Sequence, residues 1–310
     1  MKLKFIYITL AAFFLTSISF SQEDTTDEKK EGDSLEELSK QIANPLAQIW
    51  NLSFQQNFTT LDGDALSDKE HISTTLFQPV LPVPINDEWT AFARPVITFY
   101  NAPTNGTISG GSPLNPTVSG TNTKFKLGDM ILPIGVGKAK AEGWSWGGGL
   151  TFIFPSSSND LLGSHKYQMG PTALLLWGNK DWMIGGHLQH WWSIGNDGAS
   201  SSDPLINASI KAKHNSNTNH STLQYFIIRH LPNAWQIRAS PIISANWEAD
   251  TDKFTLPLAI GIGKMVKLGP MPVMLMAEYQ KAVVSPDAIG MDYTFMLQAN
   301  FIIPNPFGTL

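Results

Sequence analysis

Residues 235–247 read WQIRASPIISANW and alternate between two kinds of side chain. Every odd-numbered position is apolar, with Trp235 and Trp247 at the two ends, whereas the even-numbered positions are mostly polar. A period of two is typical of a β-strand with one face in an apolar medium. At about 3.3 Å per residue and a tilt of roughly 40°, the two tryptophans are separated by about 30 Å along a membrane normal. The stretch therefore predicts a membrane-spanning strand that joins two interfacial aromatic girdles.

The same alternation recurs along the chain from Trp50 onward. Short connections alternate with longer ones rich in Gly, Ser, Asn and Asp, as in outer-membrane barrels with short periplasmic turns and long outer loops. The connection at 249–252 is short where a long loop is expected. The sequence predicts an all-β domain over residues 50–303, a transmembrane antiparallel β-barrel of about 12 strands, with a C-terminal tail at 304–310. The twelve segments are 50–59, 71–82, 88–100, 125–138, 144–154, 166–178, 181–193, 221–230, 234–248, 253–265, 272–283 and 291–303.

The first residues have the features of a secretory signal peptide. MKLK is positively charged, FIYITLAAFFL is apolar, and Ser19 and Ser21 are small residues suited to cleavage before Gln22. The apolar run is too short for a spanning helix. We expect residues 1–21 to be removed and the mature chain to be exported to the bacterial outer membrane.

Residues 22–49 form a leader of two parts. The first part is acidic and has no apolar anchors, so we expect it to be disordered. The second begins with Ser34 and Glu37 at capping-box spacing and predicts a short amphipathic helix over 34–48. This helix could plug or cap the periplasmic mouth, because its apolar stripe needs a partner. The stripe consists of Leu35, Leu38, Ile42 and Leu46.

Composition narrows the classes of function. The chain has no cysteine, which excludes disulfides and thiol chemistry, and its net charge of −5 argues against nucleic acid as a partner. Ten Trp, seventeen Phe and twenty-five Gly are unusual for a soluble enzyme and typical of a barrel surrounded by outer-membrane lipid. We expect no cofactor, and the oligomeric state is open. The aromatic residues expected at the lipid interface are Trp50, Trp144, Trp177, Trp182, Trp192, Trp235 and Trp247.

The stretch GGHLQHWWS at 185–193 brings two histidines close together in sequence. On a helix, His187 and His190 could bind one metal ion, but on a strand they point to opposite faces. We therefore predict that they belong to the barrel wall and that there is no metal site. An acidic loop at 61–70 lacks EF-hand spacing, and GIGKM at 261–265 lacks the frame of a phosphate loop.

An embedded hydrolase is the main alternative from another functional class. His190 lies on the apolar face near the outer rim and is the candidate base, but the sequence identifies no serine on a neighbouring strand that meets it. We expect no catalytic residues, although the pairing of strands cannot be read from the sequence.

Several charged side chains fall on the inward face of the predicted strands. Charges at membrane depth occur in a wet or paired environment, so they indicate either a solute pathway or an internal ion-pair network. The predicted lumen also includes apolar residues, namely Phe92, Ile153, Leu174, Leu176, Phe226, Ile242, Met274 and Met276. The lumen-lining candidates that carry polar or ionisable groups are Arg94, His187, Arg238, Glu248 and Glu278.

Three stretches together resemble a known family. They are residues 43–58, the LGD at 127–129, and residues 143–176 with their Trp-x-Trp-Gly, Leu-Gly and Gly-Pro landmarks. They are similar to bacterial outer-membrane transporter-like barrels of the phenol-degradation MetA-pathway type, sometimes mislabelled neuromedin U. One departure is Gly149-Leu150, where the family has Gly-Pro. The resemblance implies an outer-membrane barrel with a transport role and carries over no binding residues.

These observations together favour a porin-like channel for small molecules, weakly polar or aromatic ones among them, over an enzyme. A phospholipase-like hydrolase and a structural or adhesive barrel are the alternatives.

Overall fold

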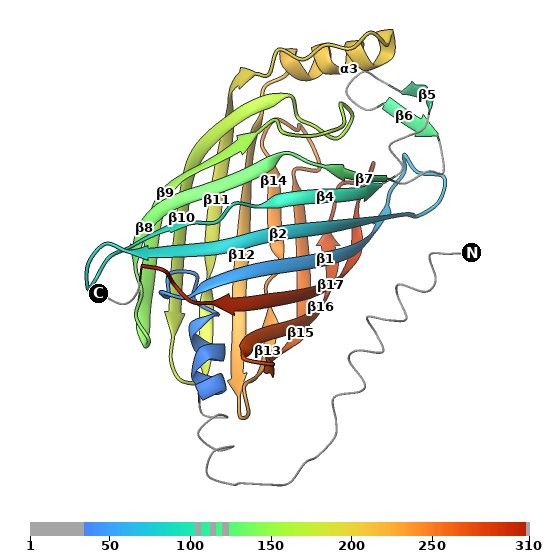
Figure 1. Cartoon of the computed structure of the whole chain (residues 1–310). Coiled ribbons are helices and arrows are strands. Elements are labelled where there is room, and N and C mark those ends of the chain that lie inside the picture. The colour runs from blue at the N-terminus through green and yellow to red at the C-terminus, as the bar shows by residue number, and fades with distance from the viewer. Residues whose placement is uncertain (1–33, 103–106, 112–115, 120–123, 308–310) are drawn as a thin grey trace.

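The computed structural model describes residues 34–102, 107–111, 116–119 and 124–307. The expected signal peptide and the acidic part of the leader lie outside these residues. The described strands form a closed antiparallel β-barrel (Figure 1). Its strands are β1 (Trp50–Asp62), β2 (Glu70–Pro84), β3 (Thr90–Ala93), β4 (Ile97–Ala102), β7 (Lys124–Leu127), β8 (Met130–Lys138), β9 (Gly143–Phe154), β10 (Lys166–Gly178), β11 (Trp182–Asn196), β12 (Asn219–Leu231), β13 (Trp235–Ala239), β14 (Ile242–Asn246), β15 (Phe254–Leu268), β16 (Met271–Val284) and β17 (Gly290–Ile303). A separate hairpin is formed by β5 (Thr107–Gly111) and β6 (Pro116–Ser119).

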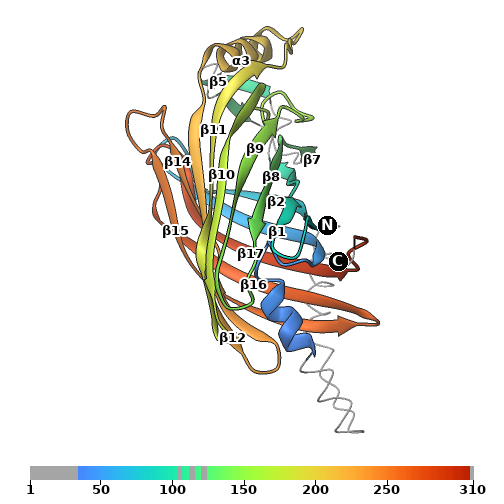
Figure 2. The same ribbon diagram turned by 90° about the vertical axis from the view of Figure 1, so that its left-hand side faces the viewer.

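These labelled strands make up the twelve wall strands that the sequence predicts, each called a stave below. The labels outnumber the staves because three staves are each interrupted once and carry two labels. The interrupted staves are β3 with β4, β7 with β8, and β13 with β14. The barrel closes where β1 pairs with β17, from Trp50↔Ile303 to Asp62↔Gly290. Figure 2 shows β10 and β11 running along the height of the molecule, with the N-terminal helix near one end and α3 at the other.

Prolines cause two of the interruptions. Pro95 separates β3 from β4, and Pro241 separates β13 from β14; proline has no N–H to donate to a ladder. The pairing with the preceding strand does not shift at either break. At Pro241, β12 pairs Ile228 with Arg238 before the proline and Gln224 with Ile242 after it, an equal advance along both strands. β2 likewise keeps one register with β3 and β4. The chain therefore continues as one stave through each proline.

Both proline breaks face a second proline. The register from Phe77↔Ile97 to Leu81↔Ala93 places Pro79 opposite Pro95. The register from Ile237↔Ile262 to Ser244↔Thr255 places Ile242 opposite Pro257, beside Pro241. At these two positions the ladder lacks the hydrogen bonds that the proline nitrogens cannot donate.

The two faces of the wall alternate as predicted. Along β10 the residues from Lys166 to Leu176 with even numbers are buried, whereas Tyr167, Pro171, Ala173 and Leu175 are exposed on the outside. This alternation gives the barrel an apolar outer surface suited to lipid. Among the described residues, no helix is long and apolar enough to span a membrane.

The leader helix is shorter than predicted and lies against the inside of the barrel. It spans residues 34–41 rather than 34–48. The residue before a proline disfavours the helical conformation, so Asn44-Pro45 limits how far the helix can continue. The apolar stripe nevertheless finds partners: Leu35, Leu38 and Ile42 pack against a cluster made of Ala234, Met265, Met274 and Met276.

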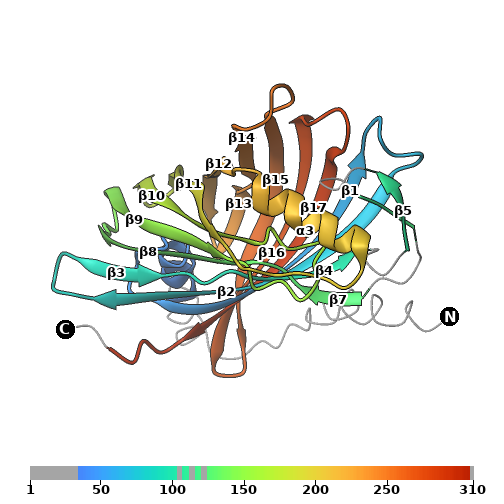
Figure 3. The same cartoon turned by 90° about the horizontal axis from the view of Figure 1, so that it is seen from above.

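The outer loop between β11 and β12 contains a second helix that the sequence pattern did not predict. This helix, α3 (Pro204–Asn215), has a proline in its first turn, and the Asp203 carboxylate accepts hydrogen bonds from the N–H groups of Leu205 and Ile206. Both are standard start signals. Its weak amphipathic pattern concealed it in a polar loop. Seen from above, α3 lies across the barrel (Figure 3).

The assignment of the two faces can be tested by placing a charge on each. Ile260, at the centre of β15, is 67 % exposed on the lipid side. Ile260→Arg should lower the free energy of unfolding by about 2–4 kcal/mol, the midplane penalty for arginine on a lipid face. Gln298→Arg on β17 extends into the lumen and should lower it by about 1 kcal/mol, the scale of a lost hydrogen bond. Denaturant titration in lipid vesicles measures both; equal losses would show that the faces are misassigned.

Candidate functional site

The interior of the barrel contains a cavity of about 260 Å³. Its lining mixes polar and apolar side chains. The polar residues on β1 and β17 are Asn51, Ser53, Gln55, Asn57, Thr294, Gln298 and Asn300, and those on β12, β13 and β16 include Gln224, Gln236, Arg238 and Gln280. The apolar residues include Phe226, Ile228, Met274, Met276 and Met296. The cavity thus offers hydrogen-bonding groups and soft, apolar groups beside one another.

The leader contributes to this cavity. Ile42, Ala43 and Pro45 are part of its lining, and Leu46 is fully buried (0 % exposed) in a cluster with Leu174, Leu176, Met183, Phe226 and Ile228. Polar contacts also hold the leader. The Gln236 Nε2 donates to the Ser39 carbonyl (2.7 Å), and the Asn44 Nδ2 donates to the Ser145 Oγ (3.0 Å). The periplasmic part of the lumen is therefore occupied by residues of the leader.

Arg94 spans the lumen. It lies at the proline break between β3 and β4, where its Nη2 donates to the Gln78 Oε1 (2.6 Å). Its Nη1 lies 3.4 Å from the Oε1 of Gln224, which belongs to β12 on a distant part of the wall. Arg94 lines the 260 Å³ cavity and also a much smaller void beside His187 and Leu46. Its side chain therefore separates an open part of the lumen from a filled part.

Arg238 and Glu278 form a nearly buried ion pair at the other proline break. The Arg238 Nε lies 3.7 Å from the Glu278 Oε2, with the two side chains 10 % and 0 % exposed. Glu278 Oε2 also accepts from the backbone N–H (3.0 Å) and the Oγ (2.9 Å) of Ser240. The carboxylate thus takes the place of the strand partner that the proline break removes. Buried charges are tolerated when they are paired and hydrogen-bonded in this way.

His187 lies inside the barrel but does not line the 260 Å³ cavity. It is 6 % exposed, and its Nε2 lies 2.7 Å from the Thr172 Oγ1. It borders the small void with Leu46, Phe92 and Leu174. His187 is therefore part of the packed side of the lumen.

Glu248 is not in the lumen. β14 ends at Asn246, and Glu248 lies exposed in the turn that follows. The alternation of two was extended past the end of the strand, and this placed Glu248 on the inward face. The correction leaves Glu278 as the acidic partner of Arg238.

The seven tryptophans expected at the interface lie near the two ends of the staves. Trp144, Trp182, Trp192, Trp235 and Trp247 are between 37 % and 56 % exposed, whereas Trp50 and Trp177 are half-buried. Basic groups accompany two of them, since the Arg229 guanidinium lies 5.0 Å from the Trp182 ring and the Lys264 Nζ lies 5.0 Å from the Trp235 ring. Such pairs suit the headgroup region of a membrane.

A serine does meet His190 on the apolar face. Register places Ser221 opposite His190, and the Ser221 Oγ lies 2.7 Å from the His190 Nδ1. The sequence did not identify this serine, because strand pairing cannot be read from it. The Trp247 Nε1 also donates to the Ser221 Oγ (2.8 Å), and the buried His190 Nε2 has no hydrogen-bond partner among the described residues. A catalytic base is normally oriented by a third group, so this pair is better explained as a polar contact at the interface.

Comparison with known proteins supports the fold. No protein-family model and no curated protein matches the chain. The chain is similar to the solved COG4313 outer membrane channel from Pseudomonas putida F1, with a TM-score of 0.54 and 13 % identity over 82 % of this chain and 94 % of that one. The NanC porin has a TM-score of 0.46 and 10 % identity, covering 82 % and 99 %.

The closed barrel and its apolar outer surface, together with this likeness, identify the fold. The chain is an outer-membrane β-barrel. Its place is the bacterial outer membrane.

The seating of the leader can be tested with one substitution. Leu46→Asp puts a carboxylate among apolar side chains, so the leader should leave the lumen. In the folded protein, trypsin should then cleave after Lys40 roughly ten-fold faster or more, because cleavage requires local opening. Glu37→Ala, on the exposed side of the helix, is the control and should cleave like the wild type. Equal rates for all three proteins would contradict the buried position of the leader.

Proposed function

We propose that the protein is a porin-like outer-membrane channel for small, weakly polar or aromatic molecules, of the phenol-degradation MetA-pathway type. The observation that carries this proposal is the mixed lining of the lumen. A pathway for sugars or phosphates is expected to be polar or charged throughout, whereas this cavity combines methionine and phenylalanine side chains with amide side chains.

The charges of the lumen support weak ion selectivity. Arg238 and Glu278 neutralise each other, and the Glu278 carboxylate is further occupied by Ser240. Arg94 is the remaining cation among the proposed lining residues, and the amide oxygens of Gln78 and Gln224 hold it. A solute therefore meets amides, thioethers and one restrained guanidinium, a surface that suits a ring carrying one or two hydroxyl groups.

The leader acts as the gate in this proposal. Its buried contacts block the periplasmic end, so passage requires Leu46 and its neighbours to move. Lumen plugs of this kind need a pathway past them for solutes to cross.

Solute entry into proteoliposomes tests the proposal. The solutes are phenyl glucoside and a disaccharide of similar length, which share a sugar head and differ in the aromatic ring. After deletion of residues 22–46, phenyl glucoside should enter several-fold faster than through the full mature chain, and faster than the disaccharide. Leu46→Asp is a second variant that opens the lumen without truncation, and protein-free liposomes give the background. Faster entry of the disaccharide, or no effect of either variant, would contradict the proposal.

The Ser221–His190 contact makes a hydrolase the second candidate function. The same liposomes, doped with a lysophospholipid, distinguish it from a channel. We expect the lysophospholipid to stay intact. Hydrolysis that disappears in Ser221→Ala would contradict a purely channel-like role.

A further inference from the structure

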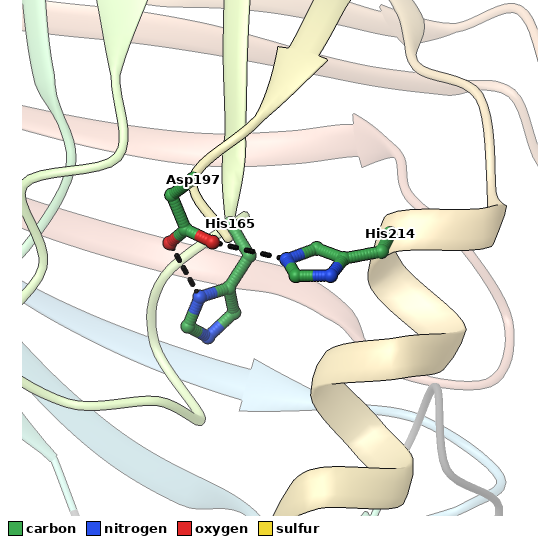
Figure 4. A group of neighbouring side chains, drawn as sticks. All are labelled: His165, Asp197 and His214. Atoms are coloured by element: carbon green, nitrogen blue, oxygen red, sulfur yellow. Dashed lines mark hydrogen bonds and ion pairs between the residues drawn. The ribbon is translucent and has the colours of Figure 1, made fainter. Parts of the chain in front are cut away.

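Three ionisable side chains from separate segments meet at the outer end of the barrel (Figure 4). His165 directly precedes β10, Asp197 directly follows β11, and His214 is in the last turn of α3. The His165 Nδ1 lies 2.8 Å from the Asp197 Oδ2, and the His214 Nε2 lies 3.0 Å from the Asp197 Oδ1. The three side chains are only 7 %, 16 % and 17 % exposed.

The spacing of the donor atoms is that of a metal site. One nitrogen or oxygen from each residue lies within 4.8 Å of the others. Around a tetrahedral zinc ion with bonds near 2.0–2.1 Å, neighbouring ligand atoms are about 3.3 Å apart. Small side-chain rotations would therefore bring all three groups onto one ion.

The orientation of His165 is compatible with metal binding. Its Nε2 lies 2.9 Å from the Asp160 carbonyl oxygen and donates to it. The Nδ1 is therefore the nitrogen that faces the Asp197 Oδ2, at 2.8 Å. A proton spans that distance as a hydrogen bond, and a bound metal ion would take the place of that proton. Metal-bound histidines characteristically donate their other N–H to a carbonyl or carboxylate.

The backbone of His165 is also unusual. Its φ is +56°, in the left-handed region that a residue with a Cβ rarely adopts. Such conformations persist where the surroundings require a particular side-chain direction, and they concentrate at functional sites. Here the unusual backbone directs the imidazole toward Asp197.

We propose that His165, Asp197 and His214 bind a divalent transition-metal ion of the zinc type, with solvent completing its coordination. The ligands are the His165 Nδ1, the His214 Nε2 and the carboxylate of Asp197. Two imidazoles and one carboxylate suit Zn²⁺, Cu²⁺ or Ni²⁺ rather than Ca²⁺ or Mg²⁺, which prefer oxygen ligands alone.

The ion would fasten the outer loops together. Lys213 already donates to the carbonyl oxygens of Asp160, Leu161 and Gly163 at 2.8–3.1 Å, which holds α3 against the loop between β9 and β10. A metal ion would add a cross-link between that loop, the end of β11 and α3. Because α3 lies across the barrel in the view from above (Figure 3), the ion would fix the position of the segment that covers the outer mouth. Metal binding itself does not depend on the proposed transport function.

Zinc binding to the folded mature chain tests this site directly. The protein carries an affinity tag without histidine, is stripped with EDTA and is then equilibrated with ZnCl₂. Elemental analysis after gel filtration should find one zinc per chain in the wild type. His214→Gln and Asp197→Asn should weaken binding by more than about 100-fold, the upper end of the effect of losing even an outer-shell partner. His71→Gln, at an exposed histidine on β2, is the matched control and should keep its zinc.

A second readout reports where the ion sits. Zinc should slow trypsin cleavage after Lys211 in α3 for the wild type and the His71→Gln control, and have no effect on the two site variants. A wild type that binds no zinc would overturn the proposal, and so would site variants that bind zinc as tightly as the wild type. The mobility of unboiled protein on a gel verifies that each variant is folded.

Discussion

Closure of the sheet through the β1–β17 ladder is the constraint on which the rest of the molecule depends. In a bilayer no water can satisfy a free N–H or C=O group, so a sheet that crosses the membrane cannot have an open edge. The ladder from Trp50↔Ile303 to Asp62↔Gly290 removes that edge. Once the sheet is closed, each stave has one face toward lipid and one toward the lumen, and this produces the alternation visible from Trp235 to Trp247.

The same constraint explains where the charges are. Proline pairs interrupt the wall at two positions, and an ionisable side chain stands at each. Glu278 accepts from the N–H of Ser240 beside Pro241, and Arg94 follows β3 just before Pro95 and reaches Gln78 on β2. Glu278 therefore has a structural role at its break, and Arg94 joins distant parts of the wall. Arg238 and Glu278 offset each other, so Arg94, held by two neutral amides, is the charge that remains among these residues.

The sequence alone was sufficient to predict the wall strands and which of their side chains face lipid or lumen. Lipid and lumen impose this alternation on each strand separately. It also predicted an apolar partner for Leu35, Leu38 and Ile42, because an apolar stripe on an exported helix must be buried. Contacts between distant segments could not be predicted in this way. The Arg94–Gln224 and Ser221–His190 contacts depend on barrel curvature and strand register, and His165, Asp197 and His214 come together only through loop packing. Glu248 was misplaced because alternation does not show where a strand ends.

In the channel that we propose, a water-accessible path runs through the barrel and the leader closes it at the periplasmic end. Single-channel conductance in planar bilayers detects such a path when the full mature chain is compared with a variant that lacks residues 22–46. Removal of the leader should produce a larger and steadier conductance with little preference between cations and anions. An unchanged conductance in the shortened chain, or the absence of any conductance, would contradict this account.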